Sequence, residues 1–190
     1  MTVDAYRTVA AMLAVEFNDL PTARWLVDDP DERLRAVRGQ FELIVEHALG
    51  HGGVVTSGDL DGAVVWFDHT VPPPPVPDYD ERLRAACGAH TDRFHRLDRV
   101  MEEHHPGDPH HYVALVGVRK ERRGNGIASA MLRRHHRVLD RDGIPAYLEA
   151  VSPETAKLYE TLGYRAHGEP YGLEPGGPFL YPMWREPQTG

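Results

Sequence analysis

Apolar residues at three- to four-residue intervals dominate the first fifty positions of the chain. Between Tyr6 and Leu49 they include Val9 and Leu13, and this interval is the period of one buried face of an α-helix. The pattern predicts two or three helices at the start, with helix already present by Asp4 or Tyr6. A glycine-rich break then ends the helical pattern.

The pattern changes to that of strands after this break. β-branched and aromatic runs at 54–55 and 63–67 predict a hairpin or a meander. Five prolines within 71–77 cannot donate ladder hydrogen bonds, so they predict a stiff extended loop. Helical spacing returns over 80–104, where Gly88 predicts a break.

The second half alternates strands and helices. The apolar, β-branched run 111–118 predicts a strand in the middle of a sheet, buried on both faces. A polar turn at 121–126 separates it from helical spacing that continues to about Asp142. This order of elements indicates a mixed α/β protein.

Another strand is predicted at 146–151, directly before a helix start. Ser152 is followed by proline and glutamate, which suit an N-cap, a first helical position and a first turn. The last helix should end at Gly163. Residues 164–166 and 179–184 then predict two antiparallel strands around a loop rich in glycine and proline.

Length and composition suit one soluble globular domain, which we expect over residues 1–190. Hydrophobic residues make up 41%, enough for a core. A net charge of −8 leaves no basic surplus for a phosphate backbone, which argues against nucleic acid as a partner. No run approaches the roughly 18 to 20 apolar residues of a membrane span, and no signal-peptide pattern opens the chain. We therefore expect a cytoplasmic protein with no membrane partner.

Cysteine and histidine usage argues against a metal site. The single Cys87 has no second thiolate with which to form a disulfide or a zinc site, and we interpret it as a small helix residue. Twelve histidines include the adjacent pairs 104–105, 110–111 and 135–136. Adjacent side chains on a helix or strand point in different directions. The sequence therefore predicts no metal.

A glycine pair between a buried strand and a helix carries the strongest chemical signal. Gly124 and Gly126 stand where free backbone N–H groups at a helix start can close on an anion. A side chain at either position would hold the anion away, and the helix dipole favours negative charge there. Arg122 and Arg123 add positive charge. The segment suits a pyrophosphate, although a tight strand-to-helix turn would also explain the glycines.

Other nucleotide-binding and nucleophile motifs fit less well. A dinucleotide-binding site would use Gly124, Gly126 and the acid Glu149, but Ser129 occupies the third glycine position. About 40 residues follow Glu149, too few for a doubly wound sheet with a substrate domain. No Gly-Lys-Ser/Thr follows the glycines, and no Gly-x-Ser-x-Gly turn occurs.

The segments 116–128 and 147–164 together resemble the acyl-CoA signature of the GCN5-related N-acetyltransferase (GNAT) superfamily. The family pattern Gln/Arg-x-x-Gly-x-Gly/Ala is matched from Glu121 to Gly126, with Glu121 as a departure at the first position. The run Leu-Tyr-Glu-Thr-Leu-Gly-Tyr ending at Tyr164 is similar to the family's Leu-Tyr-Glu-Lys-x-Gly-Phe. Within the superfamily, the layout most resembles the puromycin N-acetyltransferase branch.

The resemblance implies a particular α/β (α+β) fold, that of the GNAT acyl-CoA N-acyltransferases. Its central sheet is mixed and mostly antiparallel, is flanked by helices, and is splayed between the strands ending near Val118 and Val151. Members begin with a strand that is missing or replaced here. The cofactor-binding residues that the resemblance implies are Val116, Gly117, Val118, Arg123, Gly124, Asn125, Gly126, Ile127, Ala128, Ser129 and Ser152. Ser152 stands where many members carry an asparagine.

The implied activity is transfer of an acetyl group from acetyl-CoA to the amine of a small molecule by direct attack in a ternary complex. An antibiotic or aminonucleoside is one candidate acceptor. The resemblance gives Tyr159 the role of protonating the departing thiolate and Glu149 that of base or amine-orienting group. A main-chain N–H near Val116 or Gly117 would stabilise the thioester oxygen. Glu102, Glu103 and His104 are alternative bases.

Substrate walls are expected from the loops at 72–79 and 170–178 and from Trp66. A non-catalytic acyl-CoA-binding or regulatory module is the alternative function, because Glu121 and Ser152 replace expected contacts. A homodimer partner is left open.

Overall fold

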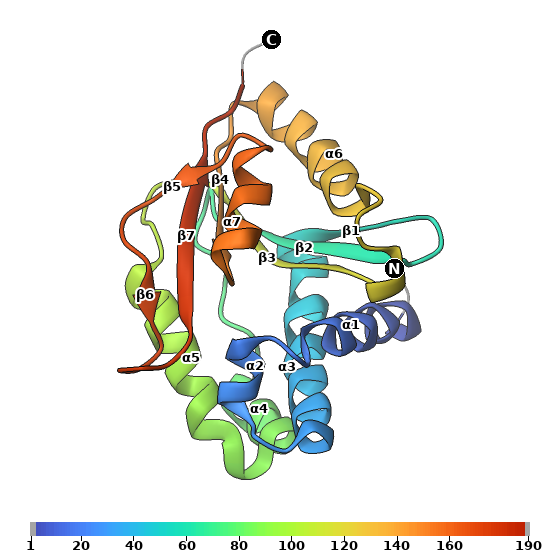
Figure 1. The fold of residues 1–190 in the computed structure, drawn as a ribbon, viewed down its shortest axis with the longest axis vertical. Helices are drawn as coiled ribbons and strands as arrows, with labels where there is room; N and C mark the ends of the chain where they lie inside the picture. Colours follow the sequence, from blue (N-terminus) through green and yellow to red (C-terminus); the bar gives the residue numbers. More distant parts are fainter. Residues whose placement is uncertain (1–2, 189–190) are drawn as a thin grey trace.

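The computed structural model describes residues 3–188, which form seven helices, two short 3-10 turns and seven strands (Figure 1). The helices are α1 (Val3–Phe17), α2 (Pro21–Leu26), α3 (Pro30–His51), α4 (Tyr79–Cys87), α5 (Thr91–His104), α6 (Ile127–Asp142) and α7 (Pro153–Glu160). The strands are β1 (Gly52–Thr56), β2 (Gly62–Asp68), β3 (His111–Val118), β4 (Ala146–Ala150), β5 (Arg165–Ala166), β6 (Tyr171–Gly172) and β7 (Phe179–Arg185). The 3-10 turns are η1 (Gly88–His90) and η2 (Lys120–Arg122).

Most element boundaries follow the local signals in the sequence. Three helices precede the first strand, and Gly88 separates α4 from α5 as predicted. Ser152 caps α7, because its side chain accepts a hydrogen bond from the Thr155 N–H. The described chain opens directly with α1, so within residues 3–188 no strand precedes the first helix. The short strand β6, inside the predicted loop, was not expected.

The strands are joined in the order β1-β2-β3-β4-β7-β5, with β6 paired to β7. All neighbouring pairs are antiparallel except β3 and β4, which are parallel. That parallel pairing covers two residue pairs, His111 with Ala146 and Tyr112 with Tyr147. Beyond them the two strands separate toward Val118 and Val151. The predicted mixed, mostly antiparallel and splayed sheet is confirmed.

A bulge in β3 lies at the point where the sheet opens. Val65 pairs with Leu115 and its neighbour Trp66 pairs with Val113, so Ala114 is an extra residue on β3. As a result Val113 packs on one face of the sheet and Leu115 on the other, although they are two positions apart. The strand alternates buried and half-buried residues. The strand lies in the middle of the sheet with buried residues on both faces, as predicted, while the half-buried residues that alternate with them also line a cavity.

Two layers of helix cover the two faces of the sheet (Figure 1). One apolar cluster packs the first five helices against one face of the sheet, through residues such as Leu13, Phe41 and Phe94. The other joins α6 and α7 to the opposite face through Leu132 and Tyr164. Among the described helices, none combines the length and apolar character that crossing a bilayer requires.

Candidate active site

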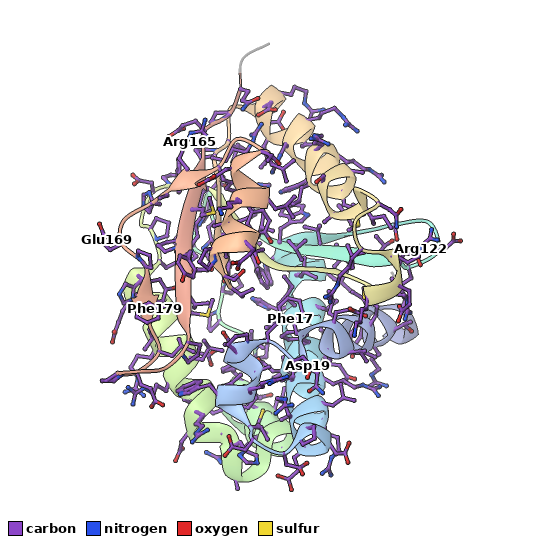
Figure 2. The ribbon with its side chains drawn as sticks, in the orientation of Figure 1. Phe17, Asp19, Arg122, Arg165, Glu169 and Phe179 are labelled. Carbon is purple, nitrogen blue, oxygen red and sulfur yellow. The ribbon has the colours of Figure 1, made fainter. Side chains whose placement is uncertain are left out.

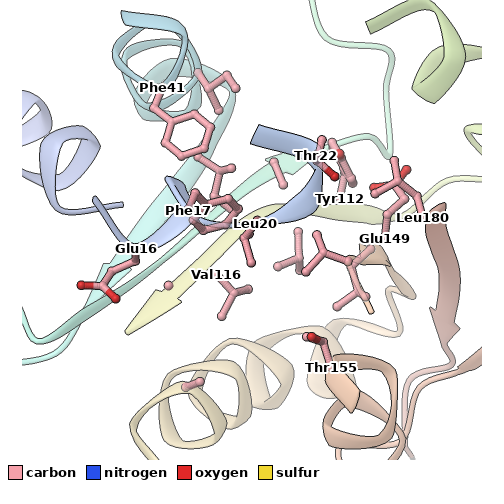
Figure 3. Close-up of a pocket in the computed structure, with 18 of the residues that line it drawn as sticks. Glu16, Phe17, Leu20, Thr22, Phe41, Tyr112, Val116, Glu149, Thr155 and Leu180 are labelled. Carbon is pink, nitrogen blue, oxygen red and sulfur yellow. The ribbon is translucent and has the colours of Figure 1, made fainter. Parts of the chain in front are cut away.

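A cavity of about 1070 Å³ opens where β3 and β4 separate (Figure 3). Its walls come from α1, the turn after it, α2, α3, α5, β3, β4, the start of α6, and α7. In Figure 3, Glu16 lies toward one end of the cavity and Glu149 toward the other, with Val116 of β3 between them. The same cavity therefore reaches the glycine turn and the carboxylate that the sequence singled out.

The glycine turn has the geometry of an anion-binding cradle. Gly124 and Gly126 adopt left-handed φ angles of 79° and 72°, which favour glycine, and a Cβ added at either would stand in open space. The first backbone hydrogen bond of α6 runs from the Ala130 N–H to the Gly126 carbonyl. The N–H groups from Gly126 to Ser129 therefore have no acceptor inside the helix. Gly124, Gly126, Ile127, Ala128 and Ser129 line the cavity.

The two arginines before the glycines are held by acidic partners. Arg123 donates to the Glu16 carboxylate at 2.7 Å, although the Glu16 side chain is only 7% exposed, and to the Val118 carbonyl at 3.2 Å. Arg122 donates to Asp61 of the β1–β2 turn at 2.9 Å. Figure 2 labels Arg122 close to that turn. This leaves the main-chain amides, with the dipole of α6, as the groups of the turn that are free to meet an anion.

The predicted cofactor-binding residues divide into two groups. Val116, Gly117, Val118 and the cradle residues except Asn125 line the cavity, as does Arg123. Asn125 and Ser152 do not. The Asn125 amide donates to the carbonyls of Arg122 and Arg123, which stiffens the turn. Ser152 is engaged as the cap of α7, and Thr155, whose hydroxyl lies 3.0 Å from that of Ser152, lines the cavity instead.

Glu149 projects from β4 into a group of tyrosines. The Tyr171 hydroxyl donates to Glu149 Oε1 at 3.3 Å, and Tyr112 and Tyr147 lie near the same carboxylate, the buried Tyr147 hydroxyl having no hydrogen-bond partner. Burial raises the pKa of Glu149 to about 7, while hydrogen bonding from the tyrosines acts in the opposite direction. A carboxyl group with a pKa near neutrality can both accept and release a proton under ordinary conditions.

Tyr159 lines the cavity from α7 and is 7% exposed. Its ring meets that of Tyr164 edge-on at 5.8 Å between centroids. Burial raises its pKa well above the ordinary value, so the phenol stays protonated and can act only as a proton donor. Tyr159 and Glu149 thus reach one cavity from neighbouring elements.

Other sequence expectations are changed by the geometry. Trp66 lies outside the cavity and stacks on His111 at 4.4 Å. Pro73 reaches the cavity from the proline-rich loop, whereas no described residue of 170–178 does. Of the alternative bases, Glu102 lines the cavity, and His104 instead stacks on Tyr171 at 3.9 Å.

Sequence reasoning missed the tyrosines around Glu149 and the acidic partner of Arg123. Tyr112 and Tyr147 are adjacent because they form the last parallel pair between β3 and β4. Glu16 is 107 residues from Arg123 along the chain. Nothing local in the sequence marks either association.

Comparison with known proteins identifies the family. Residues 18–164 match the model of the acetyltransferase (GNAT) family. An uncharacterized N-acetyltransferase of Schizosaccharomyces pombe is 25% identical over 179 residues, which cover 84% of this chain and 70% of that protein.

Solved structures agree with this match. Histone acetyltransferase HPA2 and related acetyltransferase of Corynebacterium glutamicum has a TM-score of 0.68 and 26% identity, covering 100% of this chain and 95% of the other. Arylalkylamine N-acetyltransferase 2 of Aedes aegypti has a TM-score of 0.61, with coverage of 99% and 97%. At 11% identity the latter shows a common fold only. GNAT enzymes use acetyl-CoA, and the cradle at Gly124 and Gly126 suits its diphosphate. By its sequence match and its splayed sheet, the chain belongs to the GNAT family of acetyltransferases.

Proposed function

We propose that this acetyltransferase moves the acetyl group of acetyl-CoA to the primary amine of a small molecule, by direct attack in a ternary complex. The observation that carries the proposal is that one cavity joins the unpaired amides at the start of α6 to the Glu149 carboxylate. Cofactor and acceptor can therefore meet without leaving the protein.

The chain offers a group for each step of the reaction. Ionised Glu149 accepts a proton from the ammonium form of the acceptor, directly or through one water, which frees the nitrogen lone pair. The unpaired edge of β3 near Val116 and Gly117 supplies an N–H for the negative charge that develops on the thioester oxygen. As the C–N bond forms and the C–S bond breaks, Tyr159 donates its phenolic proton to the departing thiolate, and the second proton lost by the attacking nitrogen restores the phenol.

The cavity walls favour an amine with an apolar body. Beyond β3 they include Phe17, Leu20, Phe41, Leu97 and Met101. Carboxylates also reach the cavity at its edges, which suits a cationic acceptor before its proton is lost. We include arylalkylamines and aminonucleosides among the acceptors to be tested. Membership of the puromycin N-acetyltransferase branch stays a prediction.

The test combines two measurements on one protein preparation. Calorimetry first gives the affinity for CoA, and release of free thiol from acetyl-CoA is then followed with a panel of amines, with mass spectrometry of the products. We expect CoA binding together with amine-dependent thiol release and a product heavier by one acetyl group. Glu149→Gln should keep CoA affinity and lose most of the rate.

A non-catalytic acyl-CoA-binding module is the second candidate, and the pairing of Arg122 and Arg123 with acidic partners favours it. Tight CoA binding with an intact thioester across the whole panel would support the module and overturn the enzyme.

A further inference from the structure

Three histidines from separate segments meet at the acceptor side of the cavity. His69 follows β2, His105 follows α5, and His110 precedes β3. The backbones of His69 and His110 exchange hydrogen bonds of 2.9 and 3.5 Å, which extend the β2–β3 ladder by one pair. The His105 N–H bonds to the Glu102 carbonyl as α5 ends, which turns the chain toward that pair. The backbone therefore brings the three rings together.

The ring nitrogens lie at the separation of a shared coordination sphere. His105 Nε2 is 3.0 Å from His69 Nδ1 and 3.1 Å from His110 Nε2. One nitrogen from each ring lies within 4.8 Å of the other two. Zinc–nitrogen bonds of 2.0–2.1 Å in a tetrahedral site place ligand nitrogens about 3.3 Å apart. Two of the three separations lie close to that value, and the third must shorten for all three nitrogens to share one ion.

The three imidazole rings cannot satisfy all of their facing nitrogen atoms with the N–H protons available to them. His110 Nδ1 lies 2.7 Å from the Asp108 carbonyl and must donate to it, so Nε2 of neutral His110 carries a bare lone pair. Only one N–H at His105 Nε2 is then available for two neighbouring acceptors. A proton on His69 Nδ1 instead would leave the nitrogens of His105 and His110 facing each other without a proton. A metal cation satisfies all three lone pairs at once.

The surroundings orient the rings. The aromatic rings of Tyr112 and Tyr147 meet His105 edge-on at 4.8 and 5.2 Å. The bond from His110 to the Asp108 carbonyl is the kind of outer contact that orients metal-binding histidines.

We propose that His69, His105 and His110 form a three-histidine site for a divalent zinc ion, with the fourth position directed at the cavity and available to water or to a donor atom of a bound small molecule. His69 and His105 line that cavity, which leaves one side of the trio accessible. The sequence argument against a metal considered only adjacent histidine pairs, whereas each proposed ligand comes from a different segment. The proposal does not depend on acetyl transfer.

The test uses untagged full-length protein treated with a chelator, to which Zn²⁺ or Co²⁺ is added alone. We expect one ion per chain and, with Co²⁺, the intense visible absorption typical of a site with few ligands. His105→Gln and His69→Gln should each weaken binding by roughly 100-fold and remove the absorption. His69 is half-buried, so its substitution tests the site even if His105→Gln does not fold, which circular dichroism reports.

The matched control is His51→Gln. His47 and His51 lie one turn apart on α3, with ring centroids separated by 4.6 Å, and are a competing two-ligand surface site. The control should bind metal as the unaltered chain does. Stoichiometric binding that survives both trio variants, or that is lost in the control, would overturn the proposal. The absence of binding would also overturn it and leave the trio as a hydrogen-bonded histidine chain.

Discussion

The carboxyl group of Glu149 governs the expected pH response. Since burial raises its pKa to about 7, a base at this position is protonated in acid and active above neutrality. We expect kcat/KM to fall about tenfold per pH unit below 7. Glu149→Gln should lower the rate by roughly 10²–10⁴ and remove this limb of the profile. An unchanged limb in the variant would assign it to another group, such as the acceptor amine.

The raised pKa of Glu149 also affects stability, which should decrease with rising pH while the activity increases. Between the ordinary value near 4.5 and about 7, the folded protein holds a proton on Glu149 that the unfolded chain releases. The free energy of unfolding should therefore decrease as pH rises through this interval, by up to about 3 kcal/mol. The dependence should be flatter in Glu149→Gln, as measured by urea unfolding at several pH values.

The hydroxyl of Tyr159 tests whether this buried ring takes part in the reaction. Tyr159→Phe keeps the packing on Tyr164 and removes only the proton donor. We expect kcat to fall at least about tenfold with CoA affinity unchanged. Tyr181→Phe is the control, because Tyr181 is a half-buried tyrosine of β7 outside the cavity. Equal rates in the two variants would leave Tyr159 as a core residue alone.

At the scale of the element, the two glycines that flank α6 allow a matched pair of variants. Gly126 before the helix and Gly143 after it have φ angles of 72° and 70°, and an added Cβ meets open space at both. Alanine at either position should cost about 1 kcal/mol of unfolding free energy, from backbone strain alone. Only Gly126→Ala should weaken CoA binding, as measured by calorimetry. Equal loss in both variants would show that the helix rather than the cradle is responsible.

A second element-scale prediction concerns the attachment of α6 to β7. Asp140 accepts two hydrogen bonds from Arg185, at 2.7 and 2.9 Å, and one from the Gln188 N–H. Arg185 is 3% exposed, so Asp140→Ala leaves a buried cation unpaired and should destabilise the protein by about 3 kcal/mol. Adding Arg185→Met should recover part of that loss in chemical denaturation. A double variant no more stable than Asp140→Ala alone would contradict this account.

The elements were predictable where the signal is local. Gly88, Gly143 and Ser152 each mark a helix end that depends on a few neighbouring residues. The glycine cradle was predictable for the same reason. The bulge at Ala114 was not, because it exists only relative to the partner strand. The trio of histidines also escaped prediction, since it depends on how distant segments pack.

At the scale of the whole molecule, the position of the Cys87 thiol bears on whether the acetyl group is transferred directly or through an acetylated enzyme. Cys87 is buried, lies outside the cavity, and burial raises the pKa of its thiol to about 12, so it forms no reactive thiolate. We expect intersecting double-reciprocal plots when acetyl-CoA and acceptor are varied, and full activity in Cys87→Ser. Parallel lines would indicate an acetylated enzyme intermediate and contradict direct attack.

The two residue pairs between β3 and β4 are short for a junction between two halves of a sheet, and we expect the sheet to flex there as at a hinge. From Tyr112 to Val118 the strand extends about 20 Å beyond the hinge, at about 3.3 Å per residue. A rotation of about 5° at that point would move the free end by nearly 2 Å. Small tilts of one half of the sheet against the other would therefore change the width of the gap between β3 and β4 by more than the length of a methylene group. We therefore expect the range of acyl chains that can be accommodated to depend on flexing at this hinge as well as on the side chains that line the gap.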